Sequence, residues 1–372
     1  MKASLYARMQ YVTPQHLPGG WPVAPALYDP KIGMQCFQDG MEKLEFADQL
    51  GFDWISFSEH HYSYNSVAPH PAIMAAAMVD RIKQAKLAIL AHVLPLNNPV
   101  RVAEELAMLD YLTGGRLVVG FLRGTVNEDQ TFSVNPTETR GRSLESMELI
   151  LKALTEPQPF GWEGRFYQFR TVAVWPRPLQ QPLPPTYVLT RSPESAAFAA
   201  SHHLGLGVSF APLQVTADTM RHYWALCAEH GWQPTTDDLL FRATIMIGET
   251  DEEAQEGVHR YWSSRGLANS TAAARAVSAL AGRLRGSSMP SSQSQEIGGT
   301  ASSPAAPGVQ MNFVGNPDTV FRQIKQYHDE CGVGIIDFFF QGPTMEHTVV
   351  MKSLELFAKE VLPRMRELTP PA

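Results

Sequence analysis

The sequence predicts an α/β fold of the (β/α)8 barrel class, the TIM barrel, in which eight parallel strands alternate with helices. Eight short apolar runs begin near residues 4, 52, 86, 116, 186, 207, 241 and 334, and a helical pattern follows each of them. The length of 372 residues suits eight such strand–helix units. An open, doubly wound sheet built from the same units is the alternative.

The predicted strands are compact runs of β-branched, aromatic and other apolar residues. Residues 86–94, with the sequence KLAILAHVL, are apolar almost throughout, which is typical of a parallel strand covered on both faces. The predicted strands span residues 4–12, 52–57, 86–94, 116–122, 186–190, 207–210, 241–247 and 334–340.

The predicted helices are recognised by apolar residues that recur at helical spacing, as Phe37, Met41 and Leu44 do in the first of them. Glycine is favoured just past the end of a helix, and Gly51 and Gly114 stand at such ends. The predicted helices span residues 34–50, 71–80, 100–112, 142–154, 195–203, 217–230, 318–330 and 345–365.

Two stretches interrupt this alternation. Residues 158–185 are rich in aromatic residues and proline and predict an irregular excursion before the fifth strand. Residues 263–308 form a long insertion between the seventh and eighth strands, and its second half is a low-complexity sequence that cannot bury a core. This insertion is either a solvated surface loop or a mobile lid, since loops after strands lie at the active-site face of a barrel. Residues 1–372 are expected to form one barrel domain that includes it.

The composition argues against several classes of protein. The chain has 30 Lys and Arg against 37 Asp and Glu, a net charge of −7, and no basic patch typical of nucleic-acid binding. It has neither a run of eighteen apolar residues nor a signal-peptide pattern, so a cytoplasmic protein without membrane association is expected. Three widely spaced cysteines, Cys36, Cys227 and Cys331, do not form a disulfide framework or a zinc motif.

The sequence EHHY at 59–62 directly follows the second predicted strand, where a barrel places catalytic side chains. Adjacent residues of an extended segment point to opposite sides, so we expect His60 to face the site and His61 to be structural. A neutral histidine can take and give protons near pH 7. A metal site completed by His70 and His92 is the alternative, but neighbouring histidines are poorly placed to share one ion, and no metal is expected.

Two further segments at strand ends suggest an anion site. Arg123 directly follows the fourth strand, and its partner is either a carboxylate such as Glu128 or a phosphate. Residues 190–195, with the sequence TRSPES, join the fifth strand to a helix N-terminus that offers backbone N–H groups and hydroxyls. Ordinary capping of that helix by Ser192 is the alternative.

No G-x-G-x-x-G follows a strand, and Gly205-Leu206-Gly207 precedes one, so a dinucleotide-binding unit is not predicted. The chain is therefore not expected to take reducing equivalents from a nicotinamide dinucleotide by itself.

Three blocks together resemble the bacterial luciferase-like flavin-dependent monooxygenases: EHHY, the long segment LPLNNPVRVAEELAMLDYLTGGRLVVGFLRG, and PRPLQQPLPPTYVL with the following TRSPES. The similarity extends over nearly the whole chain except the insertion. It implies a (β/α)8 barrel that receives reduced FMN from a separate NAD(P)H-dependent reductase. It also implies that molecular oxygen is activated as a flavin hydroperoxide, which oxidises a small organic substrate.

The resemblance also assigns site residues one by one. His60 matches the catalytic histidine and Arg123 the arginine that binds the flavin phosphate. The remaining cofactor contacts that it implies are Leu90, Ala91, Arg191, Ser192, Ser195 and Ser209, with a cis peptide bond before Ala91. Three positions depart from the luciferases themselves and argue against aldehyde bioluminescence: Arg191 stands in place of Glu, Leu122 in place of a reactive Cys and Phe210 in place of Trp.

The leading hypothesis is therefore a two-component FMN-dependent monooxygenase. A deazaflavin-dependent hydride-transfer enzyme on the same barrel, a non-catalytic flavin-binding protein and a metal-dependent barrel hydrolase are the alternatives. A homodimer is expected, because the helices predicted at 71–80 and 100–112 carry more small and apolar residues than one buried face needs. The sequence does not name the organic substrate.

Overall fold

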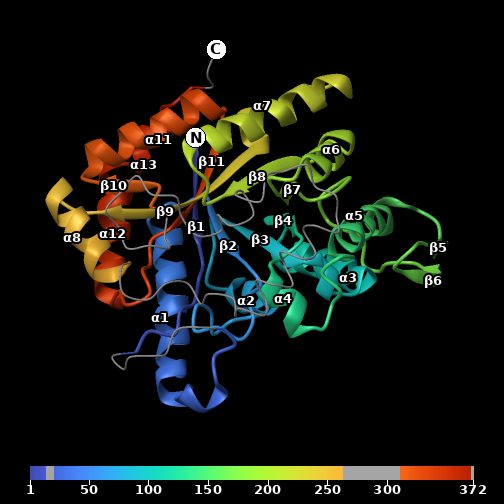
Figure 1. The fold of residues 1–372 in the computed structure, drawn as a ribbon, viewed down its shortest axis with the longest axis horizontal. Coiled ribbons are helices and arrows are strands. Elements are labelled where there is room, and N and C mark those ends of the chain that lie inside the picture. Colours follow the sequence, from blue (N-terminus) through green and yellow to red (C-terminus); the bar gives the residue numbers. More distant parts are fainter. Residues whose placement is uncertain (14–20, 263–310, 370–372) are drawn as a thin grey trace.

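In the computed structural model, residues 1–13, 21–262 and 311–369 are described, and eight parallel strands close into a barrel (Figure 1). Neighbouring strands pair in the order β1, β2, β3, β4, β7, β8, β9 and β11, and β11 pairs with β1 again. The pairing of β8 with β9 closes the barrel, so the predicted (β/α)8 class is confirmed and the open sheet is excluded. The barrel strands are β1 (Lys2–Tyr6), β2 (Trp54–Phe57), β3 (Lys86–Val93), β4 (Leu117–Leu122), β7 (Thr186–Leu189), β8 (Gly205–Ser209), β9 (Leu239–Ile247) and β11 (Ile335–Phe339).

The helices form an outer layer in which neighbours pack on one another, α2 on α3, α3 on α5, α6 on α7 and α7 on α11. The helices are α1 (Pro30–Gln49), α2 (Pro71–Met78), α3 (Pro99–Leu112), α4 (Val126–Thr131), α5 (Thr139–Thr155), α6 (Pro193–Ser201), α7 (Leu213–Glu229), α8 (Asp251–Tyr261), α11 (Pro317–Cys331), α12 (His347–Glu360) and α13 (Leu362–Arg366). Among them, none is both long and apolar enough to cross a membrane.

Most predicted bounds shift by a few residues in the structure, and two elements differ for a clear physical reason. The first strand ends at Tyr6 rather than residue 12, because the N–H of Arg8 donates to the carbonyl of Tyr6 at 2.9 Å and turns the chain out of the sheet. The single helix predicted at 345–365 is two helices, α12 and α13. Pro363 lies in the first turn of α13 and has no N–H to continue the hydrogen-bond ladder of α12.

Outside residues 158–185, the helices α4 and α8 were not predicted, and neither was the strand β10 (Phe313–Gly315), which pairs with β9 beside the barrel. For α8 the signal was present in the sequence. The Thr250 hydroxyl accepts the N–H of Glu253 at 3.1 Å, and three acidic residues occupy the first turn. This Thr-x-x-Glu spacing is a recognised start of a helix.

The prediction of an irregular excursion at 158–185 was wrong in part, because the segment contains an antiparallel hairpin of β5 (Phe160–Glu163) and β6 (Gln168–Val172). The Glu145 carboxylate on α5 anchors its turn by accepting the N–H groups of Phe166 and Tyr167, each at 2.9 Å. The hairpin projects from one side of the barrel, opposite α8 and α12 (Figure 1). The insertion predicted at 263–308, and with it the choice between a surface loop and a lid, lies outside the described residues.

The interior of the barrel contains two groups of buried side chains, one apolar and one polar. Apolar side chains from six strands form one buried cluster, made of Trp54, Ala88, Leu90, Ala91, Val118, Tyr187, Leu189, Leu240 and Ile335. A group of charged and hydroxyl side chains is also buried inside, namely Ser4, Ser56, Arg242 and Asp337. These residues alternate along their strands with residues that face the helices, as a barrel strand requires.

Candidate active site

His60 lies just beyond β2 and is held at both ring nitrogens. Its Nε2 is 3.1 Å from the hydroxyl of Tyr6, at the end of β1, and its Nδ1 is 3.3 Å from Oε1 of Glu128 on α4. The side chain keeps 26% of its surface exposed. An ionised carboxylate can only accept, so Nδ1 carries the proton and Nε2 accepts the Tyr6 hydroxyl when the ring is neutral. The ring is thus fixed in position and can exchange a proton with a molecule bound next to it.

The two partners of His60 set its protonation. Burial by itself lowers the pKa of His60, but the Tyr6 oxygen and the Glu128 carboxylate more than offset it and raise this pKa above its ordinary value. Burial raises the pKa of Glu128, and the hydrogen bonds from His60 and Thr125 outweigh it and lower the pKa to about 2. Glu128 is therefore ionised at neutral pH and favours the charged form of His60.

Tyr6 was not predicted as a site residue. Its hydroxyl is 2.5 Å from Ser58 Oγ, and the guanidinium of Arg242 lies 3.9 Å from the centre of its ring. Burial raises the pKa of Tyr6, but His60, Arg8 and Arg242 lower it to about 8. The signal that could have identified Tyr6 is its place at the carboxyl end of a barrel strand, where functional side chains gather.

The neighbours of His60 in the EHHY motif point elsewhere, as the alternation along an extended segment predicts. His61 Nε2 lies 3.1 Å from Oε1 of Glu59, and the other oxygen of this carboxylate accepts the N–H of Val93 at 2.8 Å. Glu59 also accepts the Asn97 side-chain amide, at 3.2 and 3.3 Å. Glu59 and His61 therefore fix the loop after β2 to the end of β3, which is a structural role.

The alternative of a metal site at these histidines finds no support among the described residues. His92 Nδ1 is 3.9 Å from Glu59, and burial lowers the pKa of His92 to about 4, as for a neutral core residue. Within the described ranges, the three donors close enough to hold an ion are Asp39, Glu42 and His347, which include none of these residues.

A buried charge pair lies directly below Tyr6. Arg242 Nε donates to Oδ2 of Asp337 at 2.7 Å, and a terminal nitrogen of Arg242 donates to the carbonyl of Leu90 at 2.7 Å. The other oxygen of Asp337 accepts the hydroxyl of Ser4 at 2.7 Å and that of Ser56 at 2.8 Å. Side chains of four strands, β1, β2, β9 and β11, are thereby joined inside the barrel.

The residues expected to hold the flavin ring lie in and beside this interior. Leu90 and Ala91 are fully buried in the apolar cluster, and the peptide bond between them is cis, as the resemblance implied. Leu122, at the end of β4, is half-buried and packs against the same cluster.

The residues expected to bind the phosphate follow two strands that are neighbours in the barrel, β4 and β7. They are Arg123 after β4, and Arg191, Ser192 and Ser195 after β7. Ser209, which is expected to contact the cofactor, lies at the end of the next strand, β8. Ser192 is the N-cap residue of α6, but its hydroxyl donates to Glu194 at 2.7 Å and makes no capping hydrogen bond to the helix. The Glu128 carboxylate lies 3.3 Å from Nδ1 of His60 and accepts the N–H of Thr125 at 2.9 Å.

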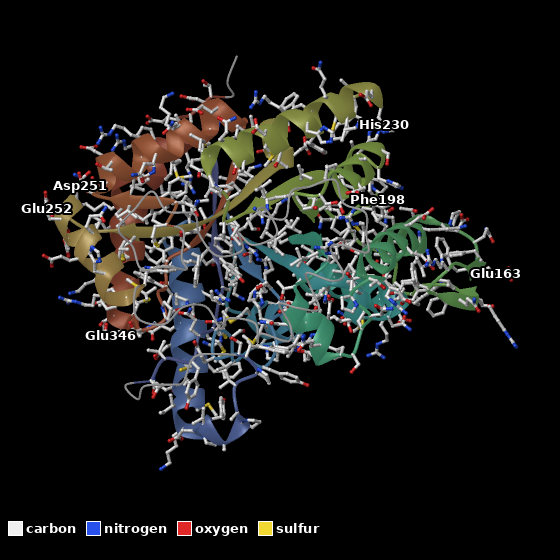
Figure 2. The ribbon with its side chains drawn as sticks, viewed as in Figure 1. Glu163, Phe198, His230, Asp251, Glu252 and Glu346 are labelled. Carbon is white, nitrogen blue, oxygen red and sulfur yellow. The ribbon has the colours of Figure 1, made fainter. Side chains whose placement is uncertain are left out.

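A surface cavity of about 600 Å³ lies between α5, the β5–β6 hairpin and α6. Phe198 on α6 and His230 at the end of α7 line it, on the flank of the molecule that also carries Glu163 (Figure 2). None of the eight residues predicted for the site lines this cavity, so it is separate from the surroundings of His60.

Comparison with known proteins places this barrel in a family. The family model described as luciferase-like monooxygenase matches residues 16–332, most of the chain. The chain belongs to the luciferase-like monooxygenase family. The resemblance seen in the sequence is therefore confirmed.

The individual relatives share only limited sequence identity with this chain. The oxygenase component of the flavin-dependent trigonelline monooxygenase of Acinetobacter baylyi is 29% identical over 61% of this chain and 64% of its own length. Other curated relatives are matched over about half of their length.

Two solved structures share the fold over nearly the whole of both chains. The oxygenating constituent of 3,6-diketocamphane monooxygenase from Pseudomonas putida, in complex with FMN, has a TM-score of 0.72 at 20% identity and covers 100% of this chain and 99% of that one. An F420-dependent secondary alcohol dehydrogenase has a TM-score of 0.67 at 15% identity, covering 98% and 99%. At these identities the likeness concerns the fold alone.

Proposed function

We propose that this protein is the oxygenase component of a two-component monooxygenase. It takes reduced FMN from a separate NAD(P)H-dependent flavin reductase and uses molecular oxygen to oxidise a small organic substrate. The observation that carries the proposal is His60, fixed between Tyr6 and Glu128 at the carboxyl end of β2 in a luciferase-like barrel, with a quarter of its side chain still exposed.

The residues present fit FMN. The phosphate of FMN needs cations and hydrogen-bond donors, and Arg123, Arg191, Ser192 and Ser195 follow two adjacent strands. The flavin ring needs an apolar wall, which the cluster containing Leu90 and Ala91, with Leu122 packed on it, offers. When bound, reduced FMN supplies the electrons with which oxygen is activated.

The chain itself supplies positioning and proton control. His60 holds a proton at Nδ1 toward Glu128 and presents Nε2 to Tyr6, so the pair can give a proton to, or take one from, a group bound beside the ring. The polar group below, Arg242 with Asp337, fixes Tyr6 from the other side.

The decisive test uses the purified chain with oxidised FMN, NADH or NADPH and a panel of ketones, aldehydes, sulfonates and aromatic compounds. Little oxidised product is expected until an unrelated flavin reductase is added, and clear product afterwards, because no dinucleotide-binding motif is present to reduce the flavin within this chain. Rapid NAD(P)H-dependent turnover by the chain alone would overturn the proposal.

One alternative is favoured by a specific observation, the barrel shared with an F420-dependent dehydrogenase. Hydride transfer by a deazaflavin consumes no oxygen. Turnover of a secondary alcohol with F420 under strictly anaerobic conditions would favour this alternative, and oxygen-dependent product formation with reduced FMN would exclude it.

Replacing Arg123 with alanine should weaken binding of FMN by roughly 10- to 100-fold and that of riboflavin far less, because a charged hydrogen bond contributes about 1.5–3 kcal/mol and riboflavin has no phosphate. Fluorescence titration with both ligands measures the difference. Arg170→Ala on the exposed face of the β5–β6 hairpin is the matched control and should change neither affinity. Equal losses of affinity for FMN and riboflavin would show that Arg123 does not bind the phosphate.

We further propose that the chain forms a homodimer through α2 and α3, which pack side by side. Ile73 on α2 is 65% exposed, and Met108, Tyr111 and Leu112 on α3 are each more than half exposed, an unusual apolar group for a surface in contact with water. Sedimentation should give a dimer mass at micromolar concentration, and Met108→Glu should give a monomer. The matched control Met34→Glu alters a methionine on α1 that is 61% exposed, against 54% for Met108, and should leave the dimer intact.

A further inference from the structure

Arg8 is a buried cation without an anionic partner. It lies two residues past the end of β1 and is only 7% exposed, yet its side chain makes no ion pair and no hydrogen bond with any residue of the described ranges. Its Nε is completely buried without an acceptor. Its guanidinium instead lies 5.3 Å from the centre of the Phe339 ring, at the end of β11.

Arg242, another buried arginine of the barrel interior, has acceptors for its charge. It has Asp337 and the Leu90 carbonyl as acceptors, both at 2.7 Å. The contrast is informative, because burying an unpaired ion carries a desolvation penalty that a cation–π contact offsets only in part. The fold does not need a cation at Arg8, and the cost of keeping one there is expected to be recovered when an anion binds.

The groups that attract the charge of Arg8 are already engaged with another residue. Arg242 repels Arg8, while Tyr6 and Glu128, which attract it, are already hydrogen-bonded to His60. Lys43 on α1 is also buried, and its ammonium group donates to the Arg8 carbonyl at 3.3 Å and to Gln341 at 2.5 Å rather than to a carboxylate.

A second buried donor without an acceptor flanks the same aromatic ring. The indole of Trp262, at the end of α8, contacts Phe339 edge-on with ring centres 5.4 Å apart, and its Nε1 is buried without a partner. Two unpaired donors and two rings, those of Phe339 and Tyr6, therefore lie close to the base of the candidate active site. Donors beside rings suit a small molecule with an acceptor group on an apolar body.

We propose that Arg8 binds the carboxylate of the organic substrate, so that the enzyme acts on a small carboxylate-bearing compound held beside His60 and Tyr6. This rests on the proposed function and specifies its substrate class. Arg8 would bind and orient the substrate by a charge-assisted hydrogen bond, while the flavin phosphate lies at the ends of β4 and β7.

The first test measures anion binding without flavin or oxygen. Acetate, hexanoate and benzoate, each paired with its neutral amide, are titrated calorimetrically into the full chain at pH 7. At least one carboxylate should bind roughly 10- to 100-fold more tightly than its amide, and Arg8→Met should abolish that preference. Arg170→Met, on the exposed face of the β5–β6 hairpin, is the matched control and should leave it unchanged. The proposal is overturned if no carboxylate binds better than its amide at tens of millimolar, or if the preference survives in Arg8→Met or is lost in Arg170→Met.

The second test separates a substrate-binding arginine from a structural one. Arg8→Met keeps the aliphatic stem and removes the unpaired charge, so its melting temperature without ligand should equal or exceed that of the wild type. Arg242→Met leaves Asp337 buried without its counter-ion, so its melting temperature should be several degrees lower than that of the wild type. If the melting temperature of Arg8→Met falls as far as that of Arg242→Met, the proposal is contradicted.

A third measurement distinguishes the substrate from the cofactor as the source of the anion. Arg8→Met should bind FMN and riboflavin as the wild type does. A loss of affinity for FMN alone would show that Arg8 binds the phosphate and would overturn the assignment. Because the carboxylate titration needs no flavin, its result stands apart from the oxygenase assay. If no carboxylate is preferred over its amide, only the anion site is refuted and the proposed function still stands. If the reductase assay fails, only the proposed function is refuted and the anion site still stands.

Discussion

Replacing His60 with alanine should lower reductase-dependent product formation by roughly 100- to 10,000-fold, the range typical of a lost general acid–base group. The ring is the exposed member of a hydrogen-bonded series in which Glu128 fixes one nitrogen and Tyr6 the other. FMN affinity should stay within a few fold, because the predicted phosphate ligands follow other strands. Product analysis with excess reductase and FMN measures the effect, and unchanged product formation would refute the role of His60.

Two variants serve as controls for His60. His61→Ala breaks the contact with Glu59 and should lower stability more than it lowers the rate in the folded fraction. Glu128→Gln removes a carboxylate that raises the pKa of His60. If the reaction needs neutral His60, activity falls as the pH drops through this raised pKa, and Glu128→Gln should move that fall to lower pH. If activity falls at the same pH in the variant as in the wild type, a group other than His60 is being titrated.

Replacing Asp337 with alanine should destabilise the fold by about 3–5 kcal/mol, because it leaves Arg242 buried without its counter-ion. Asp337 is fully buried, and its carboxylate also holds the hydroxyls of Ser4 and Ser56. Unfolding by denaturant, followed by circular dichroism, measures the loss.

The surface ion pair between Lys2 and Asp237 provides a matched control for Asp337. Its atoms are 2.6 Å apart, close to the 2.7 Å between Arg242 and Asp337, but Asp237 is 58% exposed. Asp237→Ala should therefore cost less than about 1 kcal/mol. Similar losses for the two variants would show that burial is not what makes the interior pair important.

The barrel was predictable because its strands are short, apolar and regularly followed by helices. The same rule also selected His60 and Arg123 as candidate site residues, since both come just after strands whose ends meet at one face. The split of the last helix could have been predicted from Pro363, and α8 from Thr250 and Glu253. These were signals present in the sequence that the apolar pattern alone did not use.

The partners of the site residues could not be predicted in the same way. Glu128 lies 68 residues from His60 and Tyr6 lies 54 residues from it, and only closure of the barrel brings them together. Arg242 and Asp337 are 95 residues apart, but each is a single charge within an apolar strand. Two opposite charges in such positions indicate a buried pair, although nothing in the sequence says that they meet. Arg8 is an isolated arginine in the sequence, and only its unpaired burial makes it a candidate ligand.

The carboxylate of Asp337 contacts side chains from the first two strands and from β9, and this has a consequence for synthesis on the ribosome. Ser4, Ser56 and Arg242 emerge long before Asp337 does. Until the eighth strand is available, the guanidinium of Arg242 has no counter-ion inside the barrel and is better solvated by water than enclosed. A nascent chain that stops before this point should therefore remain open and sensitive to proteases, whereas arrival of β11 supplies both the last strand and the charge that allows the interior to close.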